Sequence, residues 1–272
     1  PQNVPQHIID KIVDVTYRIA LELKVIGMIN IQFIEFRDEL YIIEVNPRSS
    51  RTVPYITKVT NVPVIDIATN IMLGKTLKEM GYSTGIAPQT NTVAIKVPVF
   101  STEKLPQVEV SLGPEMRSTG EVLGVGQNFH EAMYKGFTAA GTTIPKAGST
   151  ILVTVREMDK ENFLPIAKKF HELGCKFIAT AGTAKLLEDN DIPVQVAKKI
   201  SEGVPNILDV IRSGMIDLII DIPKKGNDIH SDGFKIRRTA IECDVSIMTS
   251  LDTVKALVDV MEHRYTPDTV EV

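Results

Sequence analysis

The second half of the chain, residues 149–272, alternates short apolar runs with stretches of helical periodicity. The runs are rich in β-branched residues, and in the stretch 160–173 the apolar residues Phe163, Ile166 and Phe170 share one helical face. Strands are predicted over 151–155, 176–179, 193–196, 216–220 and 245–248, and helices over 160–173, from 184, and over 207–213, 236–243 and 252–263. Apolar strands separated by helices are typical of a parallel sheet covered on both faces. This half is therefore predicted to be a doubly wound parallel α/β domain.

The first half, residues 1–148, lacks this alternation. A helix is predicted over 7–23, and two strand-like runs, 27–36 and 40–45, follow closely enough to form an antiparallel hairpin. The further predicted elements are helices over 64–73 and 129–139 and a strand over 91–99. This half is predicted to be α+β with an antiparallel sheet, so the chain as a whole belongs to the α/β class.

Length and composition exclude several classes of function for this chain. A chain of 272 residues allows two domains, and the small-residue stretch 139–148 is the predicted boundary between them. A net charge of −4 argues against a nucleic-acid partner. No apolar run approaches the roughly 18 residues of a membrane span, and we identify no signal peptide. Cys175 and Cys243 lack metal-ligand spacing and are predicted to be reduced and buried, as expected for a cytoplasmic protein.

The predicted hairpin gathers polar side chains on one face. If the chain turns at 37–39, Gln32 lies opposite Glu44 and Asn30 lies opposite Asn46. Because side chains alternate between the two faces of a strand, Glu44 and Asn46 then project together beside Gln32. The residues of the opposite face are apolar and are predicted to be core: Ile31, Phe33, Ile43 and Val45.

This polar cluster suits a hard cation close to phosphate. Mg²⁺ prefers one or two carboxylates together with phosphate oxygens and water. Arg48 and Arg51 follow the second strand directly, and guanidinium groups match phosphate oxygens. Enzymes that transfer phosphoryl groups usually hold the phosphate with a metal ion and fixed cationic side chains. A simple ion pair of Glu44 with Arg48 or Arg51 explains the same spacing equally well, and the pattern alone leaves both interpretations open.

Three segments resemble a known family. They are residues 30–33 with 41–54 (YIIEVNPRSSRTVP), residues 112–122 (LGPEMRSTGEV) and residues 236–240 (IRRTA). In this order they resemble motifs of the carbamoyl-phosphate synthetase large chain. The resemblance implies the C-terminal end of that subunit. Residues 1–148 would be the back part of its second ATP-grasp unit with a connector, and residues 149–272 an allosteric domain shaped like methylglyoxal synthase.

The resemblance implies roles for the hairpin residues. Gln32 and Glu44 match residues that bind ATP, and Gln32, Glu44 and Asn46 match the ligands of the Mg²⁺ or Mn²⁺ ions that accompany it. Arg48 and Arg51 match catalytic arginines of the phosphate and carbamate site. In the family this unit phosphorylates carbamate, as part of the ATP-dependent synthesis of carbamoyl phosphate for arginine and pyrimidine biosynthesis.

Partners follow from the same resemblance. They are a glutaminase small subunit, which supplies ammonia through a tunnel, and a small-molecule effector of the nucleotide or ornithine class; a homo-oligomeric state is left open. In the family, the lobe that grips the nucleotide precedes the matched region, and this sequence has no Gly-rich phosphate loop. The isolated chain is therefore expected neither to hydrolyse ATP nor to make carbamoyl phosphate.

The carboxyl ends of the predicted parallel strands gather residues suited to an anion, and ligands of such sheets bind beyond these ends. Thr154 ends the first strand, and a Thr-Ala-Gly-Thr loop, 180–183, follows the second. Thr183 is predicted to cap the next helix, whose N-terminus favours an anion. Lys160 opens the first helix, and Lys199 follows the third strand. Each lysine taken alone is explained as a solvated surface charge, but together with the loop they predict a phosphate pocket.

The resemblance implies an allosteric site here, with one departure from the family. The residues that match contacts to the phosphate of a nucleotide effector are Thr154, Lys160, Thr180, Thr183 and Lys199. Nucleotide-regulated relatives carry Asn and then Thr-Thr at the end of the fourth strand, whereas this chain has Asp221, Ile222 and Pro223. A carboxylate there is expected to repel a phosphate. Whether the effector is UMP, IMP, phosphoribosyl pyrophosphate or none is left open.

Two other functions fit parts of the sequence. A methylglyoxal synthase requires an Asp in a Gly-Gly-Asp loop after the third strand, but residues 201–205 are SEGVP, and His230 with Asp232 does not replace it. That enzyme is therefore not favoured. A stand-alone regulatory module, whose only activity is effector binding, remains the alternative for the isolated chain.

Overall fold

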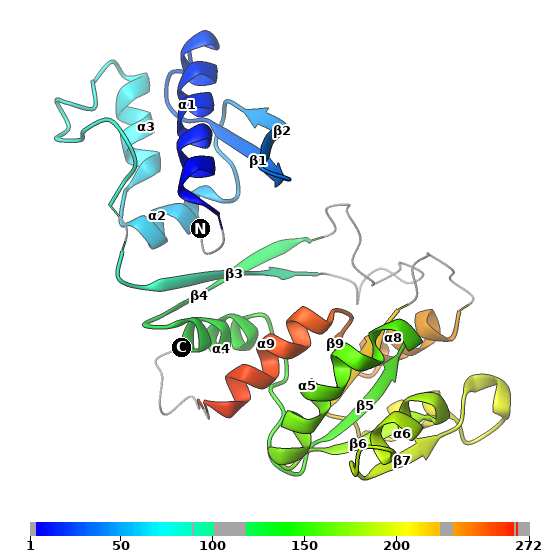
Figure 1. Cartoon of the computed structure of the whole chain (residues 1–272). Helices are drawn as coiled ribbons and strands as arrows, with labels where there is room; N and C mark the ends of the chain where they lie inside the picture. Colours follow the sequence, from blue (N-terminus) through cyan, green and yellow to red (C-terminus); the bar gives the residue numbers. More distant parts are fainter. Residues whose placement is uncertain (1–3, 89, 101–117, 224–230, 264, 266–272) are drawn as a thin grey trace. The chain divides into compact units, whose positions relative to one another are not determined.

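The computed structural model describes residues 4–88, 90–100, 118–223, 231–263 and 265, and the chain forms two compact units, Pro1–Asn91 and Thr92–Val272 (Figure 1). Most of the motif at 112–122, with Glu115 and Arg117, lies outside the described residues, as does His230.

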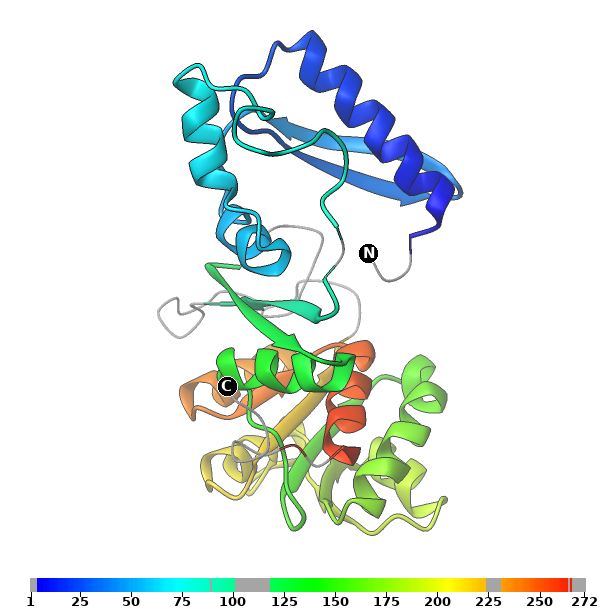
Figure 2. The ribbon, with the colours of Figure 1, turned by 90° about the vertical axis from the view of Figure 1, so that its left-hand side faces the viewer.

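The first unit contains helix α1 (Gln6–Glu22), strands β1 (Asn30–Phe36) and β2 (Glu39–Asn46), and helices α2 (Val53–Thr60) and α3 (Val64–Met72). Helix α1 packs beside the hairpin, and Lys11 donates a hydrogen bond to the Asp38 carbonyl oxygen (3.1 Å) in the turn (Figure 2). Helix α2 was not predicted. Among the described residues of this unit, only Ile8 and Ala68 are buried, so this unit has little core of its own.

The hairpin confirms the predicted pairing at its open end and departs from it near the turn. Gln32 pairs with Glu44, but a β-bulge follows, and Phe33 then pairs with Ile42 instead of Ile43. The turn has two central residues, Arg37 and Asp38, both with positive φ (53° and 68°), as tight hairpin turns require. This shorter turn shifts the register by one residue, and the bulge absorbs the difference.

The prediction of an apolar core face on the hairpin was wrong for Ile43. Its side chain is 56% exposed, because the bulge leaves Ile43 outside the register of cross-strand pairs. Ile31, Phe33 and Val45 are partly buried, and none of them is fully buried.

The second unit begins with an antiparallel pair, β3 (Val93–Val99) and β4 (Gly120–Gly126), on which helix α4 (Phe129–Ala139) packs (Figure 2). The Asn128 side chain caps α4 by accepting a hydrogen bond from the Glu131 amide (2.9 Å). Strand β4 was not predicted, because glycines are depleted in strands. Its Gly124 and Gly126 allow the α4 backbone to approach closely.

A five-stranded parallel sheet in the order β7-β6-β5-β8-β9 forms the main body of the second unit, which confirms the predicted doubly wound domain. Its strands are β5 (Thr150–Val155), β6 (Lys176–Thr180), β7 (Val194–Ala197), β8 (Leu218–Ile222) and β9 (Ser246–Met248). Its helices are α5 (Lys160–Glu172), α6 (Ala181–Glu188), α7 (Ile207–Arg212), α8 (Asp232–Glu242) and α9 (Leu251–Glu262). The short 3₁₀ turns η2 (Glu157–Asp159) and η3 (Ile200–Glu202) follow β5 and β7.

The two faces of this sheet carry separate apolar cores. Ile151 and Val153 of β5 belong to a cluster with residues of α5, α6 and α9, whereas Leu152 belongs to a cluster with residues of α7 and α8. Phe137 of α4 is part of the first cluster. Because of this packing, α4 lies in the same compact unit as the sheet, and the structural division after Asn91 differs from the predicted division at 148/149.

The two cysteines differ in environment. Cys175 is buried, as predicted, but Cys243 is exposed, so the prediction of two buried thiols was wrong for Cys243. Cys243 follows the last residue of α8, where the chain leaves the helix at the surface. In the part of the chain that the structure describes, no helix is long and apolar enough to span a membrane.

The close approach of α4 to β4 predicts a large effect of a single methyl group. A Cβ atom at Gly124 would lie 2.0 Å from the Ala132 carbonyl oxygen, whereas one at Gly120 would have Val99 Cβ, at 3.8 Å, as its nearest neighbour. We expect Gly124→Ala to lower the free energy of unfolding by about 2 kcal/mol or more, and the matched Gly120→Ala to change it by less than about 1 kcal/mol. Urea unfolding followed by circular dichroism measures both; equal effects would contradict the packing described.

The cysteines predict selective labelling. Burial raises the pKa of the Cys175 thiol to about 11, so little thiolate forms near pH 8. We expect a thiol-reactive disulfide reagent to modify one cysteine rapidly in the native chain and the second only in denaturant. The rapid phase should disappear in Cys243→Ser. Two rapid phases in the native protein would show that Cys175 is accessible.

Candidate functional site

The first candidate site is the polar face of the hairpin. The Glu44 carboxylate oxygen Oε1 accepts hydrogen bonds from Gln32 Nε2 (2.8 Å) and Asn46 Nδ2 (2.9 Å). Gln32 and Glu44 are cross-strand partners, and Asn46 lies two residues beyond Glu44, so the three side chains share one face. The predicted juxtaposition of these three side chains is thus present.

Arg48 extends this cluster beyond the end of β2. Its guanidinium donates hydrogen bonds to the Ser49 carbonyl oxygen (3.0 Å) and to Asn46 Oδ1 (3.4 Å). Arg48 therefore contacts Asn46 and Ser49. Among the described residues it forms no ion pair with Glu44, so the alternative of a simple Glu44–Arg48 ion pair is not observed. Arg51 lies in the turn before α2 and is exposed.

The donor atoms of this face fit a hard cation only in part. They comprise one carboxylate and two amides, and the described residues contain no group of three or more His, Cys, Asp and Glu side chains that could hold a metal ion. Oxygen donors of this type suit Mg²⁺ or Mn²⁺ when phosphate oxygens and water complete the coordination. The face therefore fits a metal that arrives with a phosphate ligand.

The second candidate site is a cavity of about 460 Å³ beyond the carboxyl ends of β5, β6 and β8. Its polar and charged lining residues include Thr154, Arg156, Thr180, Lys199, Asp221 and Arg237. The structure thus brings together three of the five residues predicted to contact a phosphate: Thr154, Thr180 and Lys199. Their predicted contact with an effector is not tested by this placement.

Thr180, rather than Thr183, is the cap residue of α6. The helix begins at Ala181, directly after β6, so the predicted loop 180–183 is already helical from its second residue. Thr180 makes no side-chain cap hydrogen bond. Thr183 is 2% exposed, and its Oγ1 accepts a hydrogen bond from the Val155 amide (3.3 Å). The prediction of Thr183 as the cap was wrong, because the strand passes into the helix without a loop.

Lys160 lies beside the start of α6 but does not line the cavity. Its Nζ pairs with Glu157 (2.6 Å), and it lies 3.8 Å from the position that a Cβ of Gly182 would take. Lys199 follows β7 and lines the cavity, and no ion pair of its ammonium group is found among the described residues.

Asp221 is a buried residue of the cavity lining, and the sequence pattern does not indicate its partner. Arg237 of α8 donates from Nη1 to Asp221 Oδ2 (2.6 Å), and the Thr154 hydroxyl donates to Asp221 Oδ1. Asp221 and Arg237 are each 3% exposed. The carboxylate charge expected to repel a phosphate is therefore balanced by a guanidinium. The motif 236–240 contains Arg237, but nothing in its spacing indicates which side chain it contacts.

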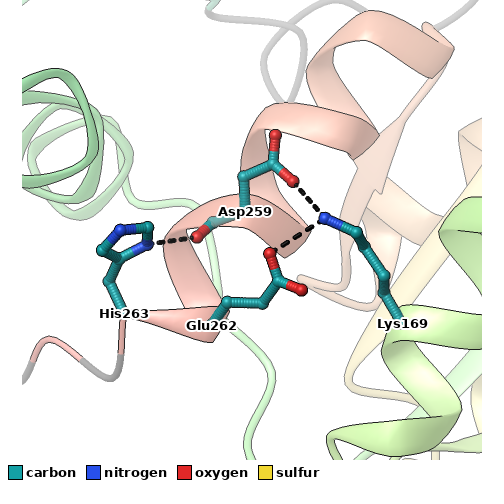
Figure 3. A network of polar contacts seen from close by, with 4 residues as sticks. All are labelled: Lys169, Asp259, Glu262 and His263. Atoms are coloured by element: carbon teal, nitrogen blue, oxygen red, sulfur yellow. Dashed lines mark hydrogen bonds and ion pairs between the residues drawn. The ribbon is translucent and has the colours of Figure 1, made fainter.

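A second cavity of about 650 Å³ lies between α5 and α9 and shares Arg156 and Ile222 with the first. Arg156 forms an ion pair with Asp159. At this groove Lys169 of α5 donates hydrogen bonds to Asp259 and Glu262 of α9, both 2.9 Å long (Figure 3). These hydrogen bonds raise the pKa of Lys169, and they join the two helices.

Two regions of the chain match models of known protein families. Residues 2–80 match the family model of the carbamoyl-phosphate synthase L chain, ATP binding domain, and residues 162–249 match that of the MGS-like domain. The carbamoyl phosphate synthase large chain of Clostridium botulinum (strain Kyoto / Type A2) is 56% identical over 95% of this chain. That of Clostridium perfringens (strain 13 / Type A) is 55% identical over 96% of this chain. The chain spans about a quarter of these relatives, 24% and 25% of their lengths.

The contacts of Lys169 predict a salt-sensitive contribution to stability. Because its folded-state pKa is raised, the contribution is complete below the unfolded-state pKa and is lost as the pH rises through the folded-state pKa. Lys169 is 39% exposed, so we expect Lys169→Met to lower the free energy of unfolding by only about 0.5 kcal/mol at low ionic strength and near zero in about 1 M salt. The neighbouring, exposed Lys168→Met is the control in urea unfolding. The same loss in both variants would exclude a specific role for the pair of hydrogen bonds.

Proposed function

The chain is homologous to carbamoyl phosphate synthase large chains over about a quarter of their length, and we propose that it supplies part of such an ATP-dependent ligase. The proposed reaction is the synthesis of carbamoyl phosphate from bicarbonate, ammonia and two ATP, with a glutaminase small subunit as the source of ammonia. Residues 1–148 would contribute to the carbamate-phosphorylating unit, and residues 149–272 would form the regulatory domain.

The observation that carries the proposal is the polar cluster at the end of the hairpin. Gln32, Glu44 and Asn46 would hold Mg²⁺ or Mn²⁺, which would neutralise charge on the phosphates of ATP. Glu44 fixes the two amide side chains through its hydrogen bonds. Arg48, which contacts Asn46, and Arg51 would bind phosphate and carbamate oxygens. Positive groups held in place stabilise the charge that spreads over a transferring phosphoryl group.

Alone, this chain would not complete the reaction. The hairpin is covered by α1 only in part, and large apolar side chains on both of its strands are more than two-fifths exposed: Ile34, Phe36, Tyr41, Ile42 and Ile43. Exposed apolar patches of this kind mark contact surfaces. We propose that other parts of a full-length large chain cover them, and that the isolated chain neither hydrolyses ATP nor makes carbamoyl phosphate.

The second unit would bind a small anionic effector. Its support is the cavity of about 460 Å³ at the carboxyl edge of a doubly wound sheet, with Thr180 and Lys199 in its lining. For the isolated chain, effector binding would then be the only activity, as in a stand-alone regulatory module.

A chimera tests the catalytic proposal. In it, this chain replaces the matching quarter of the Clostridium botulinum large chain, and carbamoyl phosphate synthesis is assayed with ammonia, bicarbonate and ATP. We expect the chimera to be active and Glu44→Gln to lower the rate by about a hundredfold or more, since the variant removes the only carboxylate of the cluster. The matched control is Glu39→Gln on the same hairpin, near the turn, which should change the rate by less than about twofold.

Two results would contradict the proposal. One is an active chimera in which Glu44→Gln retains the full rate. The other is ATP turnover by the isolated 272-residue chain that disappears in Glu44→Ala, because the chain alone would then contain a complete site.

A further inference from the structure

Two histidines outside both candidate sites meet where α4 packs against α9 (Figure 1). His130 lies in the first turn of α4, and His263 directly follows the last residue of α9. Their imidazole rings are stacked, with the ring centroids 3.8 Å apart and the ring planes 18° from parallel. Neither residue lines either of the two cavities described above. The stack therefore joins two helix ends without taking part in those sites.

Neighbouring rings extend this contact into a small aromatic cluster. Phe129 lies edge-on to His130 (centroids 5.6 Å apart), and Tyr265 stacks on His263 (6.0 Å). The Tyr265 hydroxyl donates a hydrogen bond to Asn128 Oδ1 (3.2 Å), the atom that caps α4. His130 is partly buried in this cluster, whereas His263 is exposed. The two stacked rings thus differ in their access to water.

The hydrogen bond of His263 determines where its ring binds a proton. Nδ1 lies 2.8 Å from the carbonyl oxygen of Asp259 (Figure 3). Because a carbonyl oxygen only accepts, Nδ1 carries the proton of the neutral ring, and an added proton is bound at Nε2. Protonation therefore leaves this hydrogen bond in place. The C-terminal end of a helix also stabilises a nearby positive charge.

His130 is in the opposite electrostatic situation. It lies at the N-terminal end of α4, where the helix dipole disfavours a cation. Burial and then the charge of His263 lower the pKa of His130, while Asp259 and Glu262 act in the opposite direction. Both of these carboxylates already accept hydrogen bonds from Lys169, so part of their charge is balanced. A proton on His130 is therefore unfavourable beside a charged His263.

The charged neighbours of His130 on α4 itself are paired with each other. Glu131 forms an ion pair with Lys135 (3.1 Å) and accepts a hydrogen bond from the Gln127 amide (2.8 Å). The opposite charges of this pair largely cancel at a distance. The response of the stack to pH is therefore determined mainly by the two imidazole rings and by the charged side chains of α9 and α5.

We propose that the stack of His130 on His263 is a proton-sensitive contact that holds the end of α9 to the start of α4 near neutral pH and opens in acid. With one proton, on His263, a cation faces a neutral aromatic ring, which is an attractive arrangement. With two protons, two cations face each other at a ring separation of 3.8 Å, and the contact separates. The contact requires neither ATP nor an effector, so it does not depend on the proposed function.

The direction of the pH dependence follows from the position of His130. Because its folded-state pKa is lowered, the folded chain binds fewer protons at this residue than the unfolded chain does. The stabilisation is therefore complete above the unfolded-state pKa of a histidine and is lost as the pH falls through the folded-state pKa.

Hydrogen exchange followed by mass spectrometry tests the contact on the 272-residue chain, with rates corrected for the intrinsic effect of pH. From about pH 7.5 to about pH 5, the range in which histidines titrate, we expect opening of residues 251–263 to increase about fivefold or more. In His130→Phe, which keeps a ring for stacking but binds no proton, the increase should be less than about twofold. His171→Phe replaces an exposed histidine of α5 and is the matched control, which should respond as the wild type does. Helix α7 is the internal reference for a general loss of structure.

A titration separates the effect of charge from that of packing. Nuclear magnetic resonance of ¹³C-labelled histidine rings follows each pKa, and each signal is assigned by its loss in the corresponding variant. We expect the pKa of His130 to rise in His263→Phe, because the neighbouring charge is removed while a stacking ring remains. In the wild-type chain, about 1 M salt should reduce the increase in exchange in acid, a measurement that needs no variant.

Three results would overturn the proposal. If exchange in His130→Phe increases in acid as much as in the wild type, another group is responsible. If the pKa of His130 is the same in His263→Phe as in the wild type, the two charges do not interact. If exchange of residues 251–263 in the wild type does not change over this pH range, the stack does not open in acid.

Discussion

The parallel pairing of β5 with β6 and β8 is the constraint on which the second unit depends. It places Thr154 beside Asp221 and ends β6 at Thr180, so that their side chains line one cavity. Asp221 and Arg237 also belong to the lining of this cavity, and each is only 3% exposed. Removing one partner of a buried ion pair costs about 3–5 kcal/mol, because the other charge is left without compensation. The pair therefore ties α8 to the sheet and fixes the polarity of the cavity.

The two candidate sites use their carboxylates in different ways. Glu44 lies on an exposed hairpin and accepts hydrogen bonds from two amides. Both of these hydrogen bonds go to Oε1, so Oε2 accepts none of them. Asp221 is buried, and both of its oxygens accept hydrogen bonds from neighbouring side chains. An accessible carboxylate with amide neighbours suits a metal ion that carries phosphate, whereas an enclosed and neutralised carboxylate acts through the side chains that it orients.

Much of this architecture was predictable from the sequence, because apolar runs and helical periodicity report burial directly. The five parallel strands and the pairing of Gln32 with Glu44 follow from such patterns. The departures have local causes. Strand β4 was not predicted because it contains glycines, which are rare in strands but here allow α4 to approach closely. Ile43 is exposed because a β-bulge shifts the register of the hairpin. The contact of Arg237 with Asp221 joins residues 16 positions apart through tertiary packing, which periodicity does not contain.

Neutron diffraction from deuterium-exchanged crystals of the chain tests the central claim most directly, because it locates the deuterium atom on the Thr154 hydroxyl. Nuclear density between Thr154 Oγ1 and Asp221 Oδ1, with Arg237 fully deuterated at its contact with Oδ2, is the predicted result. Density on the cavity side of Thr154 Oγ1, or on an oxygen of Asp221, would contradict it.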